Sequence, residues 1–242
     1  MHRFFVTGSW KTGDAVVLAE DQAHQISQVL RLRPQTLITL LDNTGWAYTV
    51  MLTEVNKRMV RGRVTDRTPA SGEPATHLTL YVGLLKADKF EWVLQKGTEI
   101  GVACFVPLVT ERSVVHAVSP TKQARWERIL TEAAEQSGRG RIPQLRAPFP
   151  FSAALSALPP DTLALIPYEQ EKTVALSSVP AMNGRAKVAL FIGPEGGWSE
   201  PEVALAQQHG VTPMTLGPRI LRAETAAVVA AALVLYELGD LA

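Results

Sequence analysis

Two glycine-bearing segments near the end of the chain carry the residues best suited to chemistry. Residues 192–200 read IGPEGGWSE, with three glycines and a proline in five consecutive positions. Residues 216–226 read LGPRILRAETA and place Arg219, Arg222 and Glu224 just after another glycine turn. Glycine lets a ligand approach main-chain N–H and C=O groups because no Cβ is in the way. The pattern therefore predicts a main-chain binding site beside groups that can stabilise charge or accept a proton.

The elements around the first segment predict where it lies. The apolar residues 188–192 are typical of a buried strand. Ser199 and Glu202 have the spacing of a capping box, and Gly210 marks the end of the helix that they begin. A strand, a glycine turn and a helix in this order predict a ligand site at the carboxyl end of a sheet strand. A tight turn that needs positive φ explains the glycines equally well, whereas the spacing disfavours a G-x-G-x-x-G dinucleotide site.

The charged residues of these segments each allow two interpretations. Glu224 falls in the first turn of an expected helix, where a carboxylate also stabilises the helix dipole. Arg222 could form a salt bridge with Glu224 or stabilise an anion that develops during a reaction. Glu195 could accept hydrogen bonds within its own turn or contact a ligand. None of them is an unambiguous general base, and Arg222 and Glu224 are the candidate catalytic residues.

The chain divides by pattern at residues 67–77, RTPASGEPATH, where prolines, a glycine and small polar residues interrupt the periodic segments. The part before this break predicts a compact, mainly β module. The part after it alternates strands with helices, which predicts a mostly parallel sheet covered by helices. The expected strands are 3–6, 15–19, 37–41, 46–50 and 59–64, then 78–84, 104–109, 162–166, 187–192 and 213–216; the expected helices include 20–31, 88–101 and one that begins near residue 120.

Composition limits the class of protein. Of the 242 residues, 46% are hydrophobic and 19% are charged, which is typical of a soluble globular chain. The single cysteine, Cys104, excludes an internal disulfide and indicates a reducing, cytoplasmic location.

The longest apolar run, 226–236, is too short to span a bilayer, so we expect no membrane partner. The histidines lack metal-ligand spacing, so we expect no metal partner. Residues 1–72 hold nine Lys and Arg against six Asp and Glu, a charge of +3 that suits a polyanion or a solvated face.

Several motifs, taken in order, resemble the SPOUT class of RNA methyltransferases. Most closely they resemble the RsmE family, which methylates N3 of a uridine in the decoding region of bacterial 16S rRNA. The resemblance covers nearly the whole chain. It rests on MHRFFV, HQISQVLRLRPQ, KADKFEWVLQKGTEIGV, TERS, EQSGRGRIPQ, IGPEGGWS and LGPRILRAETA.

The resemblance implies an architecture and an activity. The implied fold is α/β, with a SPOUT-type parallel sheet and a C-terminal trefoil knot at residues 76–242, after a small PUA-like β-barrel RNA-binding domain at residues 1–70. The implied function is methylation of 16S rRNA in the small ribosomal subunit by a cytoplasmic homodimer that uses S-adenosyl-L-methionine. A non-catalytic RNA-binding assembly factor is the alternative, and the intact glycine turns argue against it.

The resemblance also implies that the cofactor lies in the knot. Its walls would be the loop after residues 162–166, the turn at 193–197 and residues 216–221. Bare glycine turns with apolar neighbours suit an adenine ring, which needs an apolar slot and main-chain hydrogen bonds. The implied cofactor-binding residues are Leu165, Ile166, Tyr168, Ile192, Gly193, Gly196, Gly197, Leu216, Gly217, Ile220, Leu221 and Ala226.

Basic residues predict the RNA contacts. The stretch SGRGR, residues 137–141, joins two arginines to small flexible residues and predicts a clamp on the phosphate backbone. A solvated surface position is the alternative for each basic residue. The candidate phosphate contacts are Arg3, Lys86, Lys89, Arg112, Arg139 and Arg141.

Overall fold

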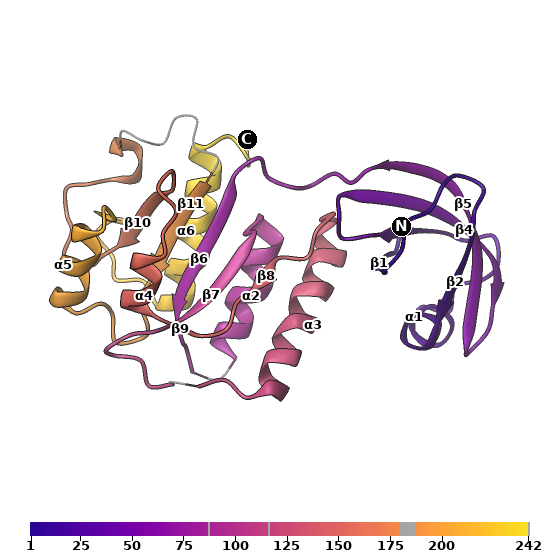
Figure 1. Ribbon diagram of the computed structural model, residues 1–242, viewed down its shortest axis with the longest axis horizontal. Helices are drawn as coiled ribbons and strands as arrows, with labels where there is room; N and C mark the ends of the chain where they lie inside the picture. Colours follow the sequence, from indigo (N-terminus) through magenta and orange to yellow (C-terminus); the bar gives the residue numbers. More distant parts are fainter. Residues whose placement is uncertain (87, 116, 180–186, 242) are drawn as a thin grey trace. The chain divides into compact units, whose positions relative to one another are not determined.

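The computed structural model describes residues 1–86, 88–115, 117–179 and 187–241 (Figure 1). Contacts between main chains divide it into two compact units. The first comprises Met1–Glu73 together with Ala134–Ile142, and the second comprises Pro74–Ala133 and Pro143–Ala242. The division after Glu73 lies within the break expected at residues 67–77, but no sequence pattern predicts that residues 134–142 join the first unit.

The first unit is built on one five-stranded sheet. Its strand order is β1-β3-β4-β5-β2, and only β1 and β3 run parallel. The helix expected at residues 20–31 is a short α-helix that continues as a π-helical turn, Gln25–Val29. The elements are β1 (Arg3–Phe5), β2 (Ala15–Ala19), α1 (Glu20–His24), β3 (Leu37–Leu41), β4 (Trp46–Val55) and β5 (Met59–Pro69).

A tight turn joins β3 to β4. The Asp42 carboxylate accepts hydrogen bonds from the Thr44 N–H at 2.8 Å and from the Tyr48 hydroxyl at 3.0 Å. Asn43 adopts a positive φ of 61°, a conformation that asparagine tolerates better than most residues. Burial raises the pKa of Asp42, but the hydrogen bonds from Thr44, Trp46 and Tyr48 outweigh it and hold the pKa below its ordinary value. The turn is therefore fixed by an ionised aspartate.

The second unit contains the predicted parallel sheet. Its strand order is β12-β10-β11-β6-β7-β8, with β9 also paired to β7, and every pairing is parallel. The strands are β6 (His77–Gly83), β7 (Cys104–Val109), β8 (Gln144–Leu145), β9 (Phe149–Pro150), β10 (Leu163–Pro167), β11 (Lys187–Ile192) and β12 (Thr212–Met214).

Helices cover both faces of this sheet, as Figure 1 shows. On one face, α4 and α5 pack over a core that includes Val106, Ile166 and Phe191. On the other face, α6 contacts β6 and β11 and packs against α2. The helices are α2 (Lys89–Ile100), α3 (Pro120–Ser137), α4 (Phe151–Ser156), α5 (Glu200–Gln208) and α6 (Ala223–Glu237), with a 3-10 turn at Leu176–Ser178. The α/β class with a parallel sheet is thus confirmed.

Candidate functional site

A cavity of about 320 Å³ opens at the carboxyl ends of β10 and β11. One wall runs from the last residue of β10 through residues 167–169 and includes Lys172, and the second runs from the last residue of β11 through residues 192–198. The third wall is the loop 215–222 between β12 and α6, together with the first turn of α6. Lys89, at the start of α2, completes the lining. The two glycine-bearing segments singled out by sequence therefore meet in space.

Most of the residues expected to bind a cofactor line this cavity. Leu165 and Ile166 do not, because their side chains are fully buried in the sheet core on the two faces of β10. The loop after the strand supplies the wall, as expected, and a cofactor contact of Leu165 and Ile166 stays a prediction. Ten of the twelve expected residues line the cavity: Tyr168, Ile192, Gly193, Gly196, Gly197, Leu216, Gly217, Ile220, Leu221 and Ala226.

The glycines of the first segment serve different purposes. Gly197 has a positive φ of 69°, so the turn does need one left-handed residue. Gly193 and Gly196 lack this conformation, and a Cβ at Gly193 would lie 3.3 Å from the main-chain carbon of Gly197. The predicted capping box is confirmed: the Glu202 N–H donates to Ser199 Oγ, and the Ser199 N–H donates to the Glu202 carboxylate. The turn is thus anchored to the start of α5.

The loop after β7 braces the same turn. Arg112, expected to contact RNA phosphate, donates from Nη1 to the carbonyl oxygen of Gly196 at 2.9 Å. The Glu111 N–H donates to the Glu202 carboxylate at 2.9 Å, and the Ser199 hydroxyl donates to Glu111 at 2.6 Å. The TERS motif therefore supports the cavity wall, which is a role that sequence reasoning missed.

Three charged side chains meet inside the cavity. The ammonium of Lys89 lies 3.5 Å from Glu195 Oε1 and 4.0 Å from Glu224 Oε2. Glu195 also accepts the N–H of Lys86 at 3.0 Å. Burial raises the pKa of Glu195, but the Lys86 N–H and the Lys89 charge outweigh it, so its pKa lies below the ordinary value. Lys89, predicted as a phosphate contact, lies in the lining of the cavity.

The two candidate catalytic residues both line the cavity. Arg222 is exposed and occupies the N-cap position of α6. Glu224 lies in the first turn of α6, and its side chain is only 16% exposed. Its Oε2 atom is shielded from solvent and accepts no hydrogen bond from the part of the chain that the structure describes. The alternative ion pair between Arg222 and Glu224 is not formed among these residues, so the Glu224 carboxylate faces Lys89.

Two further polar atoms in the cavity wall lack partners among the described residues. They are the Tyr168 hydroxyl and the indole Nε1 of Trp198, both shielded from solvent. Burial, together with the nearby carboxylates of Glu200 and Glu169, raises the pKa of Tyr168, so its hydroxyl keeps its proton. Buried donors normally find an acceptor, and these two point to a polar ligand in the cavity.

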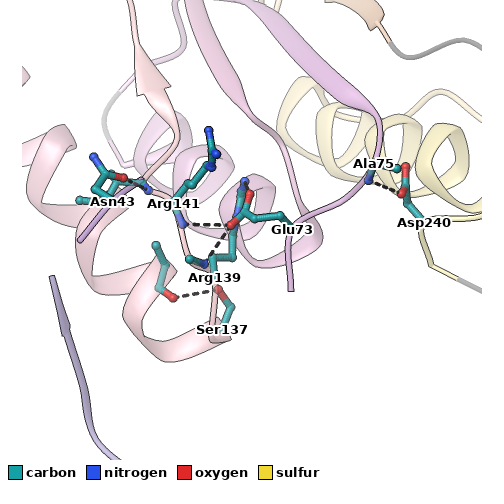
Figure 2. Close-up of polar contacts among 10 residues, drawn as sticks. Asn43, Glu73, Ala75, Ser137, Arg139, Arg141 and Asp240 are labelled. Atoms are coloured by element: carbon teal, nitrogen blue, oxygen red, sulfur yellow. Dashed lines mark hydrogen bonds and ion pairs between the residues drawn. The ribbon is translucent and has the colours of Figure 1, made fainter. Parts of the chain in front are cut away.

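The predicted phosphate clamp at SGRGR is wrong for Arg139. Its side chain is only 3% exposed, and Nε and Nη2 donate to the Glu73 carboxylate at 3.2 and 2.8 Å (Figure 2). The N–H groups of Gly140 and Arg141 donate to the same carboxylate at 3.0 and 3.1 Å. Arg141 is exposed and binds the Thr44 carbonyl through Nη2. The two arginines therefore hold the first unit together, while the candidates Arg3 and Lys86 lie exposed.

No helix among the described residues is long and apolar enough to cross a membrane. No group of three or more histidine, cysteine, aspartate or glutamate side chains among them could hold a metal ion.

Comparisons with known proteins identify RNA methyltransferases as similar to this chain. Residues 72–235 match the model of the RNA methyltransferase domain family. The chain is 36% identical to ribosomal RNA small subunit methyltransferase E of Synechocystis over 90% of its own length and 71% of that protein. It is 34% identical to the protein of the same name from Bacillus subtilis, over 90% and 88% of the two chains.

Solved structures extend the similarity to the fold. The crystal structure of a ribosomal RNA small subunit methyltransferase E from Neisseria gonorrhoeae bound to S-adenosyl methionine superposes with a TM-score of 0.93 at 32% identity and covers both chains completely. A putative methyltransferase from Legionella pneumophila in complex with the same cofactor gives 0.88 at 32% identity, over 97% and 96% of the two chains.

Proposed function

This chain belongs to the ribosomal RNA small subunit methyltransferase E family, and we propose that it methylates N3 of a uridine in 16S rRNA. The methyl donor is S-adenosylmethionine. The observation that carries the proposal is the cavity between the two glycine-bearing segments. It lies within a fold shared over the full chain with a cofactor-bound relative. The alternative of a non-catalytic assembly factor is disfavoured because this cavity is intact.

The cavity residues fit the proposed cofactor. Glycine main chain at residues 193–197 and apolar side chains of Leu216 and Leu221 suit an adenosine, while Tyr168 and Trp198 offer donors that lack protein partners. When bound, the cofactor supplies an electrophilic methyl group. The task left to the chain is to orient the uracil and to remove the proton from N3.

We propose that Glu224, which lines the cavity, accepts the proton from uridine N3. Uridine N3 carries a proton at neutral pH, and nitrogen becomes a good nucleophile only when that proton leaves. Glu224 Oε2 is shielded and has a lone pair that no described donor occupies, so it is placed to accept the proton. Arg222, exposed at the start of α6, is placed to hold the RNA backbone or the uracil in reach of Glu224.

We further propose the architecture that the family resemblance implies. Residues 1–70 act as a PUA-like RNA-binding domain, which the mainly antiparallel sheet and the +3 charge of the first 72 residues support. Residues 76–242 form the SPOUT domain, with the C-terminal segment threaded as a knot. This is supported by the insertion of β11 between β6 and β10 in the sheet. The enzyme acts on the small ribosomal subunit in the cytoplasm.

A direct assay tests the function. The purified chain, incubated with S-adenosylmethionine and small subunits that lack the modification, is expected to yield 3-methyluridine in the digested 16S rRNA, measured by mass spectrometry. Glu224→Gln should slow the single-turnover rate about 100-fold, because an amide cannot accept the proton. Its cofactor affinity, measured by calorimetry, should change less than about threefold. Methylation of a different nucleotide, or none by the unaltered chain, would overturn the proposal.

We propose a homodimer that associates through α6. Val229, Leu233 and Tyr236 are spaced along one stripe of this helix and are 37%, 41% and 59% exposed. Trp92, on the neighbouring α2, is 42% exposed. A large apolar stripe on paired helices is typical of a subunit interface.

Charge placed on this stripe should therefore dissociate the dimer. Leu233→Glu is expected to give a monomer in sedimentation equilibrium at micromolar concentration, because two buried carboxylates would face each other without partners. Val17→Glu, at an exposed apolar position of β2, makes the same kind of change outside the stripe and should leave the dimer intact. A dimeric Leu233→Glu variant would place the interface elsewhere.

A further inference from the structure

Lys89 lies in the cavity lining and not on the open surface, where a simple phosphate contact would be expected. It is the first residue of α2, which begins soon after β6 ends, and β6 is the immediate neighbour of β11 in the sheet. The start of α2 therefore lies beside the glycine turn that follows β11. The Lys89 side chain is 34% exposed and lines the cavity, whereas Lys86, three residues earlier, is exposed and does not.

The ammonium of Lys89 is held near two carboxylates without a close hydrogen bond to either. Charge-assisted N–H···O bonds are normally 2.7–2.9 Å long. The distances from Nζ to Glu195 and to Glu224 are 3.5 and 4.0 Å. Glu195 already accepts the Lys86 N–H, and Glu224 Oε2 has no hydrogen-bond donor among the described residues. A substrate atom that entered the cavity would therefore meet a cation and a carboxylate side by side.

The N3–H group of uracil and its two neighbouring carbonyl groups suit this pair of a carboxylate and a cation. Uracil N3–H lies between two carbonyl groups, so loss of the proton spreads the negative charge over N3, O2 and O4. N3 is a far weaker acid than a carboxylic acid, and transfer of its proton to Glu224 is strongly uphill unless a positive charge stabilises the anion. The other charged groups of the cavity are Glu169, Lys172, Arg219 and Arg222, which come from the loops after β10 and β12.

We propose, on the premise of the function proposed above, that Lys89 is a catalytic residue that stabilises the uracil anion through one of its carbonyl oxygens. The N3–H bond breaks, the proton passes to Glu224 Oε2, and the electron pair stays on the uracil beside the Lys89 ammonium. Glu195, ionised and fixed by the Lys86 N–H, keeps the ammonium in the cavity. Lys89 thus acts on the base, because its positive charge stabilises the negative charge that the proton transfer moves from Glu224 to the uracil.

A substrate with a more acidic N3 tests this role. Small subunits from cells grown with 5-fluorouracil carry fluorine at C5, which withdraws electrons and makes N3 easier to ionise. Single-turnover methyl transfer is measured on ordinary and fluorinated subunits across a range of pH. Lys89→Met should slow the rate about 50-fold on ordinary subunits but only about fivefold on fluorinated ones, because the fluorine supplies part of the stabilisation that the ammonium provided. Lys89→Arg, which keeps the charge, should recover most of the rate.

Two controls distinguish stabilisation of the uracil anion from attraction of RNA and from cofactor binding. Lys86→Met removes the same charge nearby, so any loss that comes from weaker RNA attraction should be equal on both substrates and should appear in KM. Cofactor affinity of Lys89→Met, measured by calorimetry, should stay within about threefold of the unaltered chain. Equal losses on the two substrates, an unaffected rate, or a cofactor affinity that falls in step with the rate would each overturn the proposal. Absence of 3-methyluridine with the unaltered chain would instead refute the proposed function.

Discussion

Replacement of Gly83 by alanine should abolish cofactor binding. Gly83 ends β6, and a Cβ built there would lie 2.6 Å from the main-chain nitrogen of Pro194 and 2.9 Å from its Cα. The obstacle is main chain, so the glycine turn itself must move, and the cavity wall moves with it. Such overpacking costs about 3 kcal/mol of unfolding free energy, measurable by denaturant titration. Calorimetric titration with S-adenosylmethionine should detect no binding at millimolar concentration.

A second glycine variant separates this clash from ordinary backbone strain. Gly210 has a positive φ of 77°, and a Cβ there meets no atom within 4 Å. Gly210→Ala should therefore cost about 1 kcal/mol through conformation alone and leave cofactor affinity unchanged. If Gly83→Ala bound the cofactor as the unaltered chain does, residues 193–197 would not form the cofactor's wall.

The site was predictable from the sequence where its residues are close together in the chain. Ser199 and Glu202 lie three positions apart and obey local rules of helix capping, so the end of the glycine turn could be placed in advance. The loop that leads to Arg222 and Glu224 follows the next strand along the chain, and its glycine and charges marked it as unusual. Local chemistry thus identified two walls of the cavity.

The contributions from distant segments could not be predicted in the same way. Gly83, Lys89 and Arg112 reach the glycine turn because β6 lies beside β11 and β7 lies beside β6. The pairing of β6 with β11 joins strands more than one hundred positions apart in the chain, and no periodicity of either strand encodes it. The sequence predicted Lys89 and Arg112 only as phosphate contacts and did not distinguish Gly83 from the rest of its strand, so only the sheet order reveals what these residues contact.

Arg139 failed as a prediction for a related reason. Two arginines among glycines are suited to phosphate, but a carboxylate satisfies the same donors. Glu73, 66 positions away, supplies that carboxylate and accepts four hydrogen bonds from residues 139–141. Composition cannot distinguish an anion site that RNA fills from one that the chain fills itself. The consequence is that Arg139 contributes to stability.

Glu73→Ala should accordingly destabilise the protein by about 4 kcal/mol in urea unfolding. The substitution removes the carboxylate partner of an arginine that is 3% exposed, and a buried ion pair that loses one member costs far more than a surface pair. It also removes the acceptor of the Gly140 and Arg141 N–H groups. Glu73→Gln, which keeps one carbonyl oxygen in the same place, should cost about half as much because part of the hydrogen bonding survives.

The exposed ion pair of Glu54 and Arg61, in the same first unit, provides the matched control. Its side chains are 52% and 56% exposed, and the atoms lie 3.6 Å apart. Glu54→Ala should cost less than about 1 kcal/mol, and high salt should erase that small effect because exposed charges are screened. The cost of Glu73→Ala should persist in salt, since the carboxylate's partner is shielded from solvent. Equal costs for the two alanine variants would mean that Arg139 is solvated in solution, and the RNA clamp predicted from SGRGR would become tenable again.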